Sequence, residues 1–144
     1  MPFWRLYYHI VWTTYKREPL ITPGMERDLY GYLIGKSVSQ EAVVHAVNGI
    51  EDHVHVVVSI PPKVAVATFV GLLKGSSSHH INHEPGASGN FGWQDEYGVV
   101  SFGEGYLARA VEYVQRQKEH HRAAICGTSL NALITPMVNH RAGS

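Results

Sequence analysis

Two histidines on a predicted strand have the type and spacing to bind a metal ion. The segment 53–60 reads His-Val-His-Val-Val-Val-Ser-Ile, and side chains alternate between the two faces of a strand. His53 and His55 therefore share one face at positions about 7 Å apart, and their imidazoles can converge on one ion. Asp52, immediately before them, can orient an imidazole by hydrogen bonding from outside the ligand set.

The opposite face of the same segment is apolar, and we assign it to the core beneath the helices. It carries Val54, Val56, Val58 and Ile60. A His-x-His motif alone is nevertheless weak evidence for a metal site. Two histidines on the exposed face of an amphipathic strand need no function, and that interpretation is favoured for the motif in isolation.

A polar stripe on the last predicted helix offers a nucleophile and a further ligand. Tyr113, Gln117 and His121 are each four residues apart, so they lie on one helix face. A tyrosine can act as a covalent nucleophile, and a metal ion bound to the attacked phosphate would draw charge from its oxygens. Periodicity alone favours the simpler interpretation, which is a half-buried tyrosine among ordinary surface residues.

The elements that position these residues are expected in the order β-α-β-β-α-β, followed by one more helix. Strands are expected at 4–13, 42–50, 54–60 and 97–102, and helices at 23–38, 63–81 and 105–122. This order predicts a ferredoxin-like α+β fold, an antiparallel sheet with two helices on one face. The other face is left for the C-terminal tyrosine-bearing helix, a partner subunit or a ligand.

The composition predicts one soluble domain. The chain has 144 residues, 44% of them hydrophobic, which suffices for a core; we expect one domain at 1–125 and a C-terminal tail at 126–144. No signal peptide or membrane-spanning run is apparent, and Cys126 is the single cysteine, so a cytoplasmic protein without a disulfide is expected. Lys plus Arg and Asp plus Glu number 12 each, so contact with nucleic acid must come from local placement.

Several segments together resemble the IS200/IS605-like transposases, the single-tyrosine (Y1) family with a histidine-hydrophobe-histidine (HUH) motif. The resemblance covers the chain from about Tyr8 to His121. The resemblance rests on five segments. In chain order they are Tyr8–Thr14 with Lys16, Arg17 and Pro19; 52–56 followed by Pro61-Pro62; Leu73-Lys74-Gly75-Ser76-Ser77; Trp93 with Tyr97-Gly98; and 113–117 with 119–121. Each segment is weak evidence alone, and the order and spacing make the match specific.

The resemblance implies a metal-dependent DNA strand transferase. His53, His55 and Gln117 would bind a divalent metal, Mg²⁺ or Mn²⁺, with His120 or His121 as alternatives to Gln117. Tyr113 would attack the scissile phosphate of single-stranded DNA and form a 5′-phosphotyrosine, and the released 3′-hydroxyl would later rejoin insertion-sequence ends. The substrates expected are DNA ends with hairpins, and the protein is expected to be a homodimer whose active site can be shared between subunits.

The residues agree with an open metal site. Two imidazoles and an amide oxygen leave coordination positions for phosphate and water, whereas a closed structural zinc site needs four ligands, often thiolates. Because Mg²⁺ prefers carboxylates, histidine ligands favour modest affinity and tolerance of Mn²⁺.

Two other functions remain open from the sequence. The first is a domesticated or inactive relative that binds or processes palindromic genomic repeats, and the second is a ferredoxin-like metal-binding module without DNA activity. Candidate phosphate contacts are Lys16, Arg17, Lys74 and Arg116, with Arg5 and Arg109 as further basic residues, although each is equally well explained as solvated surface. Trp12, Trp93 and Tyr97 could stack on bases, and core packing explains most of them as well.

Overall fold

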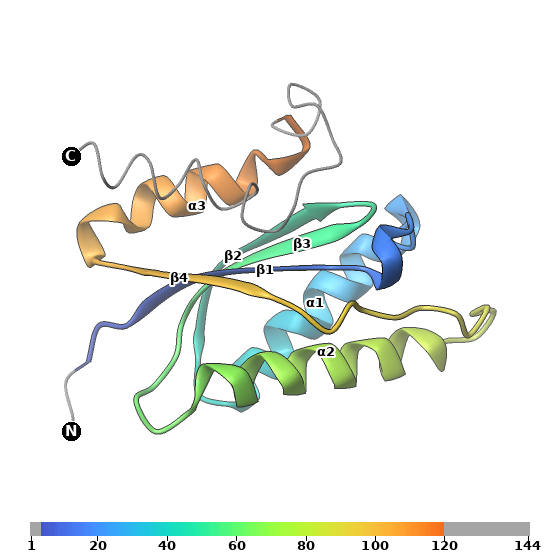
Figure 1. The fold of residues 1–144 in the computed structure, drawn as a ribbon, viewed down its shortest axis with the longest axis horizontal. Coiled ribbons are helices and arrows are strands. Elements are labelled where there is room, and N and C mark those ends of the chain that lie inside the picture. Colours follow the sequence, from blue (N-terminus) through green and yellow to red (C-terminus); the bar gives the residue numbers. More distant parts are fainter. Residues whose placement is uncertain (1–3, 120–144) are drawn as a thin grey trace.

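A four-stranded antiparallel sheet separates two layers of helices (Figure 1). The structure is a computed structural model, and it describes residues 4–119. Two long helices cover one face of the sheet, and a shorter helix lies on the other. This is the ferredoxin-like α+β arrangement expected from the order of the elements.

The strands are β1 (Tyr7–Thr13), β2 (Val43–Ile50), β3 (His53–Ser59) and β4 (Gly98–Phe102), in the spatial order β2-β3-β1-β4. The strands β2 and β3 form a hairpin whose turn is the dipeptide at 51–52. Since β3 pairs with β2 on one side and β1 on the other, it is an interior strand. Residues on both of its faces can therefore be covered, and all seven are buried.

The main core lies between the sheet and the helices α1 (Pro23–Ser39) and α2 (Val66–Asn82). Pro23 occupies the first turn of α1 as expected, although the Thr22 side chain makes no capping hydrogen bond. The strand residues expected in this core are there, together with Trp12, which is fully buried. Its large members include Ile10, Trp12, Leu29, Leu33, Val54, Val56, Val58, Ile60, Phe69 and Leu73.

A second, smaller apolar cluster joins α3 (Leu107–Gln115) to the opposite face of the sheet. Ala110 and Val114 of α3 are completely buried against strand residues, and the cluster comprises Ala46, Val57, Phe102, Ala110 and Val114. Of the three occupants expected for this face, the tyrosine-bearing helix is the one that lies there.

The last helix differs most from its expected bounds of 105–122. A 3-10 turn, η2 (Glu104–Tyr106), precedes α3, and α3 ends at Gln115, before a turn at Arg116 with angles of φ −101° and ψ 21°; residues 117–119 are helical again. The first strand also begins later than expected, at Tyr7 instead of Trp4. The expected C-terminal tail at 126–144, with Cys126, lies outside the described residues. Between residues 4 and 119, no helix has the length and hydropathy needed to cross a membrane.

Candidate metal and tyrosine site

The predicted histidine pair lies on the sheet face that α3 covers. In β3, His53 and His55 alternate with the valines that enter the main core, and their ring centroids are 5.0 Å apart. Their exposed fractions are 1% and 0%. The interpretation of two histidines on an exposed strand face is therefore wrong, because a helix from 60 residues further along the chain covers them.

His53 is oriented by a carboxylate from the hairpin turn. Its Nδ1 lies 2.9 Å from Asp52 Oδ1, and Asp52 Oδ2 lies 3.3 Å from the Arg17 guanidinium. Burial acts to raise the pKa of Asp52, but the hydrogen bonds and charges of His53 and Arg17 together hold it below its usual value. Asp52 is therefore a carboxylate that accepts the Nδ1 proton, and this leaves the lone pair of His53 on Nε2.

The side chain of Gln117 faces that lone pair. Gln117 is 3% exposed, and its Oε1 lies 3.5 Å from His53 Nε2. Its amide nitrogen donates to the Tyr113 carbonyl at 3.3 Å, and this contact fixes which end of the amide points at the histidine. The predicted third ligand is thus adjacent to the histidine pair, with an oxygen acceptor opposite a nitrogen acceptor.

Two facing acceptors suit a cation better than a hydrogen bond. Ligand atoms bound at about 2.1 Å to a tetrahedral or octahedral ion lie about 3.0 to 3.4 Å apart, close to the observed spacing. Imidazole and amide ligands also suit Mn²⁺ and other first-row divalent ions. The residues present therefore fit a divalent metal, and His53, His55 and Gln117 are the ones that would hold it.

A third histidine, which sequence reasoning missed as a site residue, supports His55. His9 of β1 is fully buried, and its Nε2 lies 2.7 Å from His55 Nδ1. Burial lowers the pKa of His9 to about 4, so it is neutral at neutral pH and can accept the Nδ1 proton of His55. That tautomer would leave His55 Nε2 as a metal-binding nitrogen, as Asp52 does for His53.

His9 could have been found only by combining strand alternation with strand register. Alternation places it with Val11 and Thr13 on one face of β1. Across the antiparallel ladder, Val11 pairs with His55 and Thr13 pairs with His53. The pairing partner and register depend on the whole fold, so the isolated Tyr8-His9 dipeptide carries no such signal.

Tyr113 lies beside both of these histidines. Its ring makes edge contacts with His9 and His55, at centroid distances of 5.8 and 6.0 Å. Burial raises the pKa of Tyr113, and a hydrogen bond with Gln117 partly offsets that rise. The phenol of Tyr113 alone is therefore a weak nucleophile at neutral pH. Its reactivity depends on a group bound at the histidine pair, such as a metal ion.

The basic residues named from the sequence do not gather around this site. Lys74 donates to the carbonyls of Gln94 and Glu96, and Arg116 is ion-paired with Glu112 and Glu119. Arg5 is ion-paired with Glu104. Arg17 is the exception, because it reaches the site through Asp52. His120 and His121, the alternative ligands, lie outside the described residues.

A strained turn places Arg17 there. Lys16 and Arg17 have φ values of 53° and 55°, which non-glycine residues rarely adopt. The turn is fixed by backbone bonds from Tyr15 to Gly92 and from Gln94 to Thr13, and Lys16 N donates to Gln94 Oε1 at 2.9 Å. Strain of this kind persists where the surroundings hold it, and here the consequence is an ion pair behind His53.

Comparison with known proteins identifies the family of this chain. Residues 2–117 match the family described as "Transposase IS200 like". The transposase of insertion sequence IS200 from Salmonella typhimurium is 29% identical over 127 residues, which cover 83% of this chain and 81% of that protein. The ISDra2 transposase TnpA of Deinococcus radiodurans is 25% identical over 122 residues, covering 81% and 86%.

Two solved structures share the fold. One, from Deinococcus radiodurans R1 and assigned as a transposase, has a TM-score of 0.62 at 23% identity, covering 81% of this chain and 93% of that one. The other, a REP-associated tyrosine transposase bound to a REP hairpin, has a TM-score of 0.60 at 15% identity, covering 84% and 74%. The family match extends from the first strand to Gln117 and so includes every part of the site described above, and the chain belongs to the IS200-like transposase family.

Proposed function

We propose that this transposase cleaves and rejoins single-stranded DNA ends through a covalent bond between Tyr113 and a 5′-phosphate. The observation that carries the proposal is the convergence of Tyr113, Gln117 and the two β3 histidines on one buried site from segments about 60 residues apart. Family membership supports DNA strand transfer as the activity, and the residues of the site are of the types that would act as nucleophile and metal ligands in such a reaction.

Each residue of the site has one role in the proposed reaction. His53, His55 and Gln117 would hold a divalent ion, Mg²⁺ or Mn²⁺, which when bound withdraws charge from the phosphate oxygens. The Tyr113 hydroxyl gives its proton to water, its oxygen forms a bond to phosphorus, and the bond from phosphorus to the 3′-oxygen breaks. The departing oxygen takes up a proton and becomes a free 3′-hydroxyl. Asp52 and His9 keep each histidine in its metal-binding tautomer throughout.

The reverse reaction rejoins DNA without an external energy source. A 3′-hydroxyl attacks the phosphotyrosine, the bond from phosphorus to Tyr113 breaks, and the number of phosphoester bonds is unchanged. We further propose that the DNA partner is an end with a nearby hairpin, which the hairpin bound to the REP-associated neighbour supports, and that the protein works as a homodimer.

The test is a search for a covalent protein–DNA adduct. Labelled single-stranded oligonucleotides spanning both flanks of the gene, with their hairpins, are incubated with the protein and Mn²⁺ and separated under denaturing conditions. We expect an adduct with the unmodified protein and none with Tyr113→Phe. Tyr106→Phe is the matched control, because it removes the hydroxyl of a tyrosine seven residues before Tyr113. This variant should still form the adduct.

The outcomes separate the competing functions. An adduct that persists in Tyr113→Phe would exclude Tyr113 as the nucleophile. Binding of the hairpins without any adduct, in Mg²⁺ and in Mn²⁺, would favour the domesticated or inactive relative. The metal-binding module without DNA activity predicts neither binding nor an adduct, and membership in a transposase family argues against it.

A further inference from the structure

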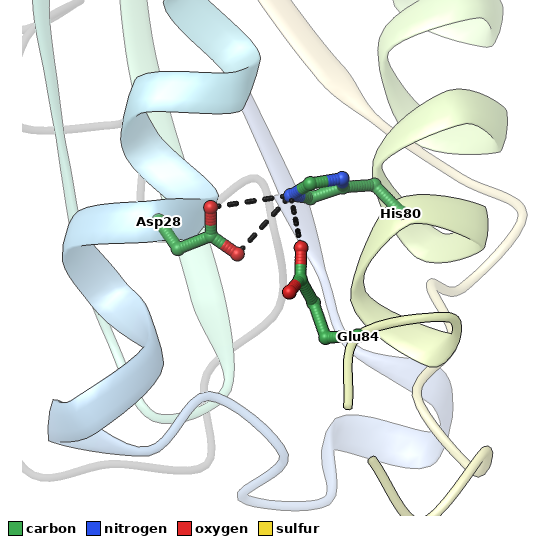
Figure 2. A group of neighbouring side chains, drawn as sticks. All are labelled: Asp28, His80 and Glu84. Atoms are coloured by element: carbon green, nitrogen blue, oxygen red, sulfur yellow. Dashed lines mark hydrogen bonds and ion pairs between the residues drawn. The ribbon is translucent and has the colours of Figure 1, made fainter. Parts of the chain in front are cut away.

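A second group of side chains that could hold a metal ion lies on the layer of α1 and α2 (Figure 2), on the face of the sheet opposite to α3 (Figure 1). Asp28 projects from α1, His80 from the last turn of α2, and Glu84 from the segment just after α2. All three point into the space between the two helices. None of them contributes to the tyrosine site, and transposase chemistry as proposed above leaves them without a role.

The three side chains converge more tightly than one hydrogen bond requires. His80 Nε2 lies 3.2 and 3.1 Å from the two Asp28 oxygens and 3.0 Å from Glu84 Oε1. A single N–H can point well at only one oxygen, yet three oxygens surround this nitrogen. Nitrogen and oxygen ligands bound at about 2.1 Å to a tetrahedral zinc ion lie about 3.4 Å apart, so small shifts would place an ion among them.

Two of the three side chains, those of Asp28 and His80, lie on helices that pack into the main core. Asp28 and His80 directly neighbour Leu29 and Ile81, both buried in the main core, so the backbone of each ligand is fixed by packing. Tyr32, one turn after Asp28 on α1, stacks on the His80 ring at 4.4 Å with an interplanar angle of 18°. His80 and Glu84 are four residues apart, a spacing that brings side chains together. Such support reduces the ordering cost of binding.

The cluster is also open to solvent on one side. The side chains of Asp28, His80 and Glu84 are 50%, 28% and 43% exposed. The neighbouring hollow is lined by Gly24, Arg27 and Gly31 besides Asp28, Tyr32 and His80, and a Cβ at either glycine would meet no atom within 4 Å. Water or a further ligand can therefore reach an ion held there.

We propose that Asp28, His80 and Glu84 form a second divalent-cation site that takes zinc-class transition ions. One imidazole and two carboxylates are a donor set that Zn²⁺ and Co²⁺ accept readily, with the fourth position open to water. Because the ligands come from α1 and from the end of α2, a bound ion would tie these two helices together. The ion would not take part in the reaction at Tyr113.

Metal binding to the purified full-length chain tests the site. Co²⁺ is titrated and followed by its visible absorption, and Zn²⁺ by calorimetry. We expect two equivalents bound to the unmodified protein and one to His80→Gln, together with a smaller Zn²⁺-dependent rise in melting temperature, because the tyrosine site still binds one ion. Asp28→Asn should weaken the second equivalent at least tenfold. The His53→Ala/His55→Ala variant should keep this equivalent while losing the other, and the His80→Gln comparison stands even if that variant does not fold.

The matched control is a pair of histidines on the same helix end. His79 and His83 stack on each other at 3.9 Å, outside the cluster, so the variant His79→Gln/His83→Gln should keep both equivalents. Loss of the second equivalent of metal in that variant would assign this equivalent to His79 and His83 instead of His80, and would overturn the proposal. Identical metal binding by unmodified protein and His80→Gln would show that the cluster is an ion pair only.

Discussion

His9 is a neutral imidazole enclosed between a second histidine and a tyrosine ring. Burial lowers its pKa from 6.5 to about 4, so between those values the unfolded chain binds a proton at this position and the folded chain does not. The free energy of unfolding therefore falls as the pH drops from about 6.5 to about 4, and the loss levels off below that. A shift of this size corresponds to about 3 kcal/mol.

Replacing His9 by glutamine should remove that part of the acid sensitivity. We expect the free energy of unfolding of His9→Gln, measured by urea denaturation at pH 7 and at pH 4, to fall less than that of the unmodified protein, by about 3 kcal/mol. The comparison between the two pH values cancels any constant cost of the substitution. Equal losses in the two proteins would mean that His9 takes up a proton in the folded chain as easily as in the unfolded one.

We expect Asp52 to influence metal binding through His53 and not as a ligand itself. Because its carboxylate fixes the tautomer and ring plane of His53, Asp52→Asn should weaken Mn²⁺ binding at the tyrosine site by about 10- to 100-fold. Glu51→Gln removes an exposed charge from the same hairpin turn and should leave that affinity nearly unchanged. The affinities of the two variants for Mn²⁺ can be compared by electron paramagnetic resonance. Equal weakening in both would mean that Asp52 acts only through its negative charge and not by orienting His53.

At the scale of elements, the hairpin that carries His53 depends on one glycine. A Cβ built on Gly49 would lie 2.1 Å from the His53 carbonyl oxygen and 2.9 Å from Val54 Cα, and both are backbone atoms that cannot rotate away. Gly49→Ala should therefore destabilise the fold by about 2 kcal/mol and also weaken metal binding at the tyrosine site, because relief of the clash must displace His53.

The control for this prediction is Gly105→Ala. A Cβ at Gly105 would meet no atom within 4 Å, so this substitution should change the melting temperature little. Thermal unfolding monitored by circular dichroism measures both variants. A Gly49→Ala protein as stable as the unmodified one would mean that β2 and β3 can separate locally without cost.

The strand patterns could be predicted from local sequence, whereas the associations between elements could not. Alternation in 53–60 identified which side chains enter the main core and which face α3, because a strand has a fixed period of two. The end of α3 at Gln115 and the role of His9 depend on contacts with distant segments, and nothing in the neighbouring residues encodes these. Likewise, the ion pair of Arg17 with Asp52 requires two consecutive residues at positive φ, which no residue type there predicts.

At the scale of the whole molecule, Tyr113 lies beside the histidines of its own chain. If this arrangement persists in a homodimer, mixing Tyr113→Phe with His53→Ala/His55→Ala should not restore the DNA adduct, because no chain would have both functions. We expect no adduct in the mixture, measured after co-refolding so that mixed dimers can form. Recovery of the adduct would instead show that α3 of one subunit serves the histidines of the other.

The burial of the histidine pair has a consequence for the order of events on DNA. With exposed fractions of 1% and 0%, His53 and His55 cannot receive a phosphate while α3 stays in place, so the enzyme must open before it can react. The buried residues of the cluster that holds α3 are two alanines, two valines and one phenylalanine, far less apolar volume than the core beneath α1 and α2. Separation of α3 should therefore be the sub-global opening of lowest free energy, and amide protons of α3 should exchange with deuterium well before those of β1 and β3.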